Sequence, residues 1–232
     1  MNWYEEAFRK EYLDLYYHRD EKAAKGEAEF ATKAMGLQPG SRVLDIACGG
    51  GRHARAMKEL GFEVVGLDLS RDLLQEADGI LRVRGDMRSL PFSGGFHGAT
   101  SFFTSFGYFD EAGNQAVLST AADALRSGGV YLIDYLNATL VQTRLVPESE
   151  EERGGLTYKM SRRIEDGRVK KHVRIEGGDE PQEYEESVAL YLHNDLVALL
   201  VEAGLSPVAT YGDFDGRDFT TDAPRCIVVA KK

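Results

Sequence analysis

Short apolar runs alternate with helix-like segments over residues 42 to 136. We predict five strands there, each a run of mainly aliphatic and aromatic residues, at 42–47, 62–67, 80–84, 98–103 and 129–135. The segments between these strands predict three helices, at about 51–60, 70–78 and 113–126. Ser70 and Asn114 are the expected N-caps, and the pair Gly128-Gly129 is expected to stop the third helix. This alternation is typical of a doubly wound α/β fold, a mostly parallel sheet with helices on both faces.

The regions on either side add helices and a second set of strands. Two helices, at about 2–17 and 20–35, precede the first strand, and we expect residues 1–36 to form a helical lid. After Asn137 the pattern changes to extended runs at 156–164, 168–176 and 183–192. The first two flank Glu165-Asp166-Gly167, whose Gly suits the left-handed position of a short hairpin loop.

We therefore predict that residues 154–192 form a small three-stranded antiparallel insertion, or flap. It lies between the fifth strand and the last helix, which we predict at 194–203. Two final strands, at 207–212 and 225–231, return the chain to the main sheet. All 232 residues then form a single domain, a length that can bury a substantial core.

Composition narrows the class of protein. The net charge of −10 disfavours non-specific binding to nucleic acid. The two cysteines, Cys48 and Cys226, could form at most one bridge, which indicates a reducing compartment. The charged N-terminus lacks the apolar core of a signal peptide, and the longest aliphatic stretch, Leu196 to Val201, is too short to span a bilayer. We expect a cytoplasmic protein with no membrane segment.

Three acids stand where the first three predicted strands end. Asp45 precedes the turn Ala47-Cys48-Gly49-Gly50-Gly51, Asp68 ends the second strand, and Asp86 follows the third. Small residues let the backbone approach a ligand closely, and a carboxylate at the next strand end can accept hydrogen bonds from ribose hydroxyls. The spacing fits only the relaxed form of the dinucleotide fingerprint, because position 54 is Ala. The three acids together favour a nucleoside-binding site.

These motifs resemble those of class I S-adenosylmethionine-dependent methyltransferases. The segment Asp45-Ile46-Ala47-Cys48-Gly49-Gly50-Gly51 is similar to the first motif of that family, and Asp68 matches its ribose-binding acid. Gly85-Asp86-Met87 is similar to the segment that contacts adenine, and Leu125-x-x-Gly128-Gly129 to the approach to the fifth strand. One departure is Phe96-His97-Gly98, where the family often opens its fourth strand with Asp.

The resemblance implies a seven-stranded sheet with an antiparallel final strand and S-adenosyl-L-methionine as cofactor. The glycine loop would hold the methionine end, Asp45 would anchor the loop or the amino group, and Leu69 and Met87 would enclose adenine. Tyr17 and Arg19, in the N-terminal helices, could reach the cofactor carboxylate or the substrate, or could simply pack on the domain. The cofactor residues implied in this way are Asp45, Ala47, Cys48, Gly49, Gly51, Asp68, Leu69, Gly85, Asp86, Met87, Phe103, Tyr17 and Arg19.

The acceptor side of the predicted site is less well defined. The aromatic stretch 101–109 follows the fourth strand. Tyr108 is the candidate for orienting the acceptor, whereas Phe102 and Phe103 more often fill the core, because strand aromatics are usually packed. Asp134 and Asn137, at the end of the fifth strand, are further candidates for binding or orienting it. Arg162 shares one face of its strand with Tyr158, Met160 and Ile164, and could anchor an acidic acceptor. The five histidines show no zinc-site spacing, and we expect no metal.

We predict methyl transfer to a nitrogen or oxygen atom of a small molecule, with two alternatives open. Residues 153–174 carry eight Lys and Arg against Glu165 and Asp166, and such a hairpin could bind RNA phosphates. More often such charges form a solvated face or pair with nearby acids, such as those at 179–186. The second alternative is a non-catalytic subunit that binds cofactor. The flap could close the substrate cavity or pair with a second copy, so both a monomer and a homodimer are open.

Overall fold

The computed structural model describes residues 3–4, 21–178 and 180–232, and its core is a seven-stranded sheet. The strand order is β10-β11-β5-β4-β1-β2-β3, and β11 runs antiparallel to both of its neighbours. This arrangement confirms the predicted mostly parallel sheet and its antiparallel final strand. The strands are β1 (Arg42–Ile46), β2 (Glu63–Asp68), β3 (Leu81–Arg84), β4 (Phe96–Ser101), β5 (Leu125–Leu136), β10 (Ser206–Tyr211) and β11 (Arg225–Lys231).

Helices cover both faces of this sheet, because successive strand residues point to opposite sides. Val43 packs with helices α3 and α4 in one apolar core, whereas its neighbour Leu44 packs with α6 and α8 in the other. No described helix has the length and apolar character needed to cross a membrane. The helices are α3 (Glu21–Ala34), α4 (Arg52–Glu59), α5 (Arg71–Glu76), α6 (Glu111–Ala124), α7 (Ala138–Arg144) and α8 (His193–Glu202).

Of the two predicted N-caps, one is confirmed and one is wrong. Ser70 caps α5, because its hydroxyl accepts a hydrogen bond from the Leu73 N–H at 3.2 Å. The Asn114 prediction is wrong: Asp110 caps α6 and accepts from the Gly113 N–H at 2.8 Å. Asn114 is buried, and its amide instead binds the backbone of Phe109. The third helix also ends at Ala124, before the pair Gly128-Gly129, which lies within β5.

The insertion is larger than predicted. It is a four-stranded antiparallel sheet in the order β6-β7-β8-β9, which extends from residue 148 rather than 154. Strand β6 reads Glu-Ser-Glu-Glu-Glu-Arg, and without alternating apolar residues it carries no strand signal; helix α7 before it was also missed. The strands are β6 (Glu148–Arg153), β7 (Leu156–Glu165), β8 (Arg168–Glu176) and β9 (Gln182–Ala189).

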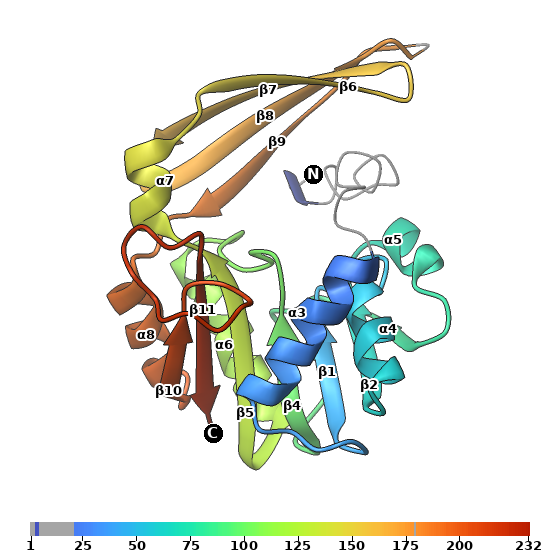
Figure 1. Ribbon diagram of the computed structural model, residues 1–232, viewed down its shortest axis with the longest axis vertical. Coiled ribbons are helices and arrows are strands. Elements are labelled where there is room, and N and C mark those ends of the chain that lie inside the picture. Colours follow the sequence, from blue (N-terminus) through green and yellow to red (C-terminus); the bar gives the residue numbers. More distant parts are fainter. Residues whose placement is uncertain (1–2, 5–20, 179) are drawn as a thin grey trace.

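The second sheet lies beyond the carboxyl ends of the parallel strands (Figure 1). The hairpin between β7 and β8 turns at Asp166 and Gly167, both with positive φ, as predicted for the Gly. The Ala189 N–H at the end of β9 donates to the Gly107 carbonyl at 2.8 Å. The insertion therefore contacts the loop that follows β4, on the edge of the main sheet where ligands bind in open α/β folds.

Candidate active site

A cavity of about 500 Å³ opens at the carboxyl edge of the main sheet. Loops that follow β1, β2, β3 and β4 form its walls, which brings together side chains that lie far apart in the sequence. Tyr108 also lines it, whereas Gly51 does not, and Tyr17 and Arg19 lie outside the described residues. The predicted cofactor residues that do line it are Asp45, Ala47, Cys48, Gly49, Asp68, Leu69, Gly85, Asp86, Met87 and Phe103.

The turn after β1 needs its glycines. Gly49 and Gly51 have φ of 54° and 76°, and a Cβ at Gly51 would lie 3.0 Å from the Ala77 Cβ. Gly51 therefore shapes the turn from behind, as the N-cap of α4, rather than facing the cavity. The Cys48 thiol packs within this turn, and burial raises its pKa far above the usual range. A thiol held neutral in this way is no nucleophile, so Cys48 serves as a small packing residue.

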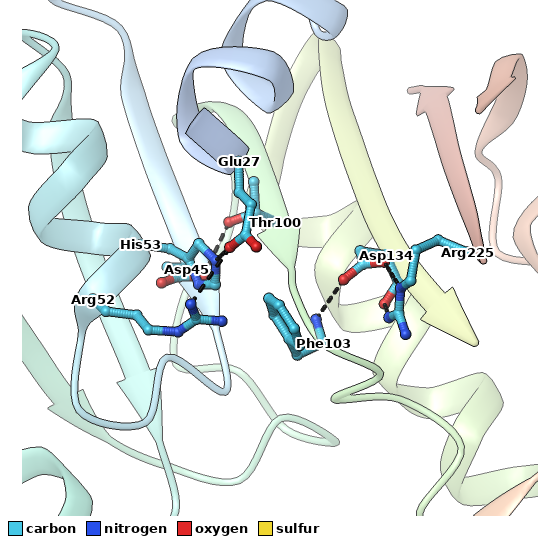
Figure 2. A network of polar contacts seen from close by, with 8 residues as sticks. All are labelled: Glu27, Asp45, Arg52, His53, Thr100, Phe103, Asp134 and Arg225. Carbon is cyan, nitrogen blue, oxygen red and sulfur yellow. Dashed lines mark hydrogen bonds and ion pairs between the residues drawn. The ribbon is translucent and has the colours of Figure 1, made fainter. Parts of the chain in front are cut away.

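Asp45 is the most deeply buried acid in the cavity wall. Its side chain is buried, and Oδ1 accepts a hydrogen bond from the Thr100 hydroxyl at 3.1 Å (Figure 2). Among the residues that the structure describes, none donates a hydrogen bond to Oδ2. Burial raises the pKa of this carboxyl to about 7. A buried carboxylate with an unpaired oxygen favours a cationic hydrogen-bond donor in the cavity.

The other two acids at the strand ends differ from Asp45. Asp68 is buried and accepts from the Gly49 and Ser70 N–H groups, each at 2.8 Å, which ties the end of β2 to the glycine turn. Burial still raises its pKa. Asp86 is partly exposed and pairs with Arg88, whose hydrogen bonds to the carboxylate lower the pKa of Asp86. The three acids thus share one edge, as predicted, in three different electrostatic environments.

A polar network beside Asp45 was not predicted. His53 and Glu27 are hydrogen-bonded at 2.6 Å (Figure 2). The His53 ring stacks on Phe102, with ring centroids 3.9 Å apart. Burial lowers the pKa of His53 to about 4, which keeps the imidazole neutral. Arg52 lies 3.5 Å from Glu27 and 4.3 Å from the Phe103 ring centroid. The network joins α3 to α4 at the cavity wall and places one guanidinium there.

The loop after β4 is held in an unusual conformation. Phe103 and Thr104 both have positive φ, which non-glycine residues seldom adopt outside functional sites. Asp134 stabilises the loop: it is fully buried, accepts from the Phe103 N–H at 2.7 Å and pairs with Arg225 at 2.7 Å (Figure 2). Arg225 in turn donates to the Thr104 hydroxyl at 2.9 Å.

Two predicted acceptor residues are corrected by these contacts. One carboxylate oxygen of Asp134 accepts from the Phe103 N–H and the other from Arg225 of β11, and Asp134 lines neither the 500 Å³ cavity nor the second cavity described below. Asn137 is buried and caps α7, and its amide donates to three backbone carbonyls in the segment 220–223. The two side chains therefore hold neighbouring segments of the chain in place rather than facing either cavity.

A second cavity, of about 240 Å³, lies between this loop and the four-stranded sheet. Phe103 and Tyr108 line both cavities and so form a shared wall. Arg162, the predicted anchor for an acidic acceptor, lines the second cavity. The other lining residues are Trp3, Thr104, Leu136, Val141, Leu145, Val169, Lys171, Glu186, Val188 and Arg225.

Arg168 fixes the segment 107–109 that carries Tyr108. Its guanidinium donates to the carbonyls of Gly107, Tyr108 and Phe109 at 2.9 to 3.0 Å, and also to Ser187 of β9. Nothing in the sequence singled out Arg168 from the other cations of the hairpin. Its partners lie about 60 residues earlier in the chain, and only the fold brings them together.

The basic hairpin is largely neutralised by acids of the same sheet. Seven of the eight cations are accounted for, because six pair with carboxylates and Arg168 binds backbone carbonyls and Ser187. This supports the interpretation that the charges form a solvated face, and it weakens the case for a basic groove that binds RNA. The pairs are Arg153 with Glu151, Lys159 with Glu176, Arg163 with Glu165 and Glu185, Lys170 with Glu165, Lys171 with Glu186, and Arg174 with Glu176 and Glu183.

Comparison with known proteins gives consistent matches. A family model described as a methyltransferase domain matches residues 43–129. The chain is 30% identical to the dTDP-3-amino-3,6-dideoxy-alpha-D-glucopyranose N,N-dimethyltransferase of Streptomyces fradiae, over 90% of this chain and 85% of that protein. It is 26% identical to the glycine/sarcosine N-methyltransferase of Aphanothece halophytica, over 100% of this chain and 91% of that protein.

Solved structures extend the likeness to the whole fold. A S-adenosylmethionine-dependent methyltransferase from Clostridium acetobutylicum ATCC 824 matches with a TM-score of 0.82 at 18% identity, over 95% of this chain and 98% of that chain. At this level of identity the match shows the shared fold, which includes the region of the four-stranded insertion.

Proposed function

Because this chain belongs to the class I S-adenosylmethionine-dependent methyltransferases, we propose that it methylates a nitrogen atom of a small-molecule acceptor. The observation that carries the proposal is the pair of adjoining cavities, which share Phe103 and Tyr108 as a common wall. The larger cavity has the size and lining for the cofactor, and the smaller one lies on the acceptor side. Both curated relatives are named as N-methyltransferases, which favours nitrogen over oxygen as the acceptor atom.

The described residues fit the cofactor group by group. The unpaired Oδ2 of Asp45 would accept from the ammonium group, and Arg52, one of two arginines in the same wall, would hold the carboxylate. Asp68 would accept from the ribose hydroxyls. Leu69 and Met87 would enclose adenine, and Asp86 would accept from its amino group.

When bound, S-adenosylmethionine supplies a methyl group on a positively charged sulfur, which is a good leaving group. The protein then contributes mainly by positioning the two reactants and excluding water from the site. Phe103 and Tyr108 face the acceptor and keep water from the shared wall, and aromatic faces attract cationic groups. Arg168 and Asp134 hold the backbone on which these two rings are carried.

The first test separates cofactor binding from turnover. Calorimetry with S-adenosylmethionine should show binding, and Asp68→Asn should weaken it by about 10-fold or more, because hydrogen bonds to a charged group are worth about 1.5–3 kcal/mol. Asp78→Asn is the matched control, because its side chain is exposed and pairs only with Arg82 in the described structure. Equal weakening by both variants would contradict the assignment of Asp68.

The second test measures methyl transfer from labelled cofactor to the acceptors named for the relatives: glycine, sarcosine and the dTDP-amino sugar. Transfer to any of these supports the proposal. Cofactor binding without turnover of any amine would favour the non-catalytic subunit instead. RNA that co-purifies with the protein, bound with an affinity that falls steeply with salt, would favour the RNA alternative.

A further inference from the structure

Cations outnumber acids among the described residues that line the second cavity. Three of its lining residues are cations, Arg162, Lys171 and Arg225, and one is an acid, Glu186. Arg225 is already balanced by the buried carboxylate of Asp134 at 2.7 Å. Among the described lining residues, one carboxylate therefore remains for two cations, in a protein whose net charge is −10.

The sheet register places these charges side by side. Arg162 of β7 lies directly opposite Lys171 of β8, and Lys171 lies opposite Glu186 of β9. Side chains in directly opposed positions share one face of a sheet, and like charges placed there repel. Lys171 and Glu186 approach to 3.8 Å. Arg162 stands at the other end of this row, away from the acid.

Arg162 differs from the cations around it in its partners. Its guanidinium donates to the Ser149 hydroxyl at 2.9 Å and to the Val146 carbonyl at 3.4 Å, but it forms no ion pair with a carboxylate of the described residues. The next residue, Arg163, points to the opposite face of the sheet and pairs with Glu165 and Glu185. Ser149 orients Arg162 without neutralising it, which leaves a positioned cation in a cavity wall.

We propose that the second cavity recognises the methyl acceptor by an anionic group, a carboxylate or a phosphate, bound by Arg162 with Lys171 beside it. This inference rests on the proposed function. A guanidinium matches both anions through paired hydrogen bonds, and an anion would relieve the repulsion between the two opposed cations. At about 240 Å³ the cavity holds a small metabolite or the end of a larger one. The acceptor is thus a small amine that carries a negative charge, with its nitrogen directed to Phe103 and Tyr108.

The test compares acceptors that carry a negative charge with related acceptors that lack it. Glycine is paired with glycinamide, and the dTDP-amino sugar with the same amino sugar lacking the nucleotide. We expect turnover of at least one charged member and at least about 10-fold lower kcat/KM for its neutral partner, because a hydrogen bond to a charged group is worth about 1.5–3 kcal/mol. A preference in the glycine pair indicates that the cavity binds a carboxylate, and a preference in the amino-sugar pair indicates a phosphate. Equal turnover of both members of each pair would overturn the inference while leaving the methyltransferase function intact.

Arg162→Gln tests the residue itself, with Arg163→Gln as the matched control on the opposite face. We expect Arg162→Gln to raise KM for the charged acceptor about 10- to 100-fold, with cofactor affinity unchanged. Arg163→Gln should leave KM within twofold of the wild type, and Arg162→Lys should restore part of the loss. A KM that is unchanged in Arg162→Gln would refute the assignment.

A binding measurement keeps the inference testable if no acceptor of the panel is methylated. Acetate and inorganic phosphate serve as probes at millimolar concentration, on protein saturated with S-adenosylhomocysteine and at matched ionic strength. At least one probe should raise the melting temperature of the wild type and of Arg163→Gln, but not that of Arg162→Gln. No anion-dependent shift in the wild type overturns the inference. Failure of the wild type to bind S-adenosylmethionine at all would instead count against the proposed function.

Discussion

Asp45 should destabilise the free protein at neutral pH, in exchange for binding the cofactor. Its pKa is raised by burial from 3.8 to about 7, a difference of about 3 units. Each unit corresponds to 1.36 kcal/mol, so ionising Asp45 in the folded state costs about 4 kcal/mol. Because burial raises the pKa of Asp45 in the folded state only, the contribution of Asp45 to the free energy of unfolding is complete below about pH 3.8. It is lost as the pH rises to about 7.

The perturbation is Asp45→Asn, which removes the charge and keeps the shape and the acceptor for Thr100. The introduced amide takes the place of Oδ2, which has no hydrogen-bond partner among the described residues. Burying this unpaired amide offsets about 1–3 kcal/mol of the stability gained by removing the charge. We therefore expect the variant to be more stable than the wild type by about 1–3 kcal/mol at about pH 8, without cofactor. The difference in the free energy of unfolding between the variant and the wild type should grow by about 2.5 kcal/mol between about pH 5 and about pH 8, because only the wild type has a carboxyl at position 45 that ionises in this range.

The assay is urea unfolding of both proteins at several pH values, with the difference in the free energy of unfolding as the readout. Asp86→Asn is the control, because the pKa of Asp86 is lowered and its contribution changes only below 3.8. Saturating cofactor should reverse the order by stabilising the wild type alone. A difference between Asp45→Asn and the wild type that does not change with pH would refute the reasoning, as would wild-type cofactor affinity in the variant.

Three further outcomes follow from the same contacts. Cofactor affinity should fall about tenfold per pH unit below about 7, because protonated Asp45 no longer offers a negatively charged acceptor to the ammonium group; calorimetry across pH measures this. Arg168→Ala should lower kcat/KM about 10-fold or more with cofactor affinity unchanged, because the carbonyls of 107–109 lose a charged donor, as steady-state kinetics would show. Asp134→Ala should cost about 3–5 kcal/mol of stability in urea unfolding, because it leaves Arg225 without its carboxylate.

The loop after β4 links the two sheets and explains why these residues should act together. Asp134, from the main sheet, holds the backbone at Phe103, and Arg168, from the insertion, holds the backbone around Tyr108. The hydroxyl of Tyr135 also donates to the carbonyl of Ala189 at the end of β9. The wall between the two cavities thus depends on both sheets, so changes in the insertion should affect acceptor kinetics more than cofactor affinity.

The sequence alone determined the main sheet and the cofactor edge. Asp45, Asp68 and Asp86 could be placed because each directly follows or ends an apolar run, and parallel strands end at one edge. The glycine turn was equally readable, since positive φ at Gly49 and Gly51 is a local requirement. These features depend on neighbours in the chain, and the periodic pattern carries that information.

Only the tertiary structure decided which polar side chains face a ligand. Asp134 and Asn137 stand at a strand end, like Asp45 and Asp68. Their side chains nevertheless bind other parts of the protein: Asp134 pairs with Arg225, and Asn137 donates to the backbone of Ala223, both more than 80 residues away. The partners of Glu27, His53 and Arg168 are set by how helices and sheets pack, and no local pattern encodes them.

Strand β6 has no apolar alternation and forms because β7 offers it an open edge. Arg162 looks like its neighbours in the sequence, and only the register of the sheet sets it apart, because alternation sends it to the cavity and Arg163 to the acids outside.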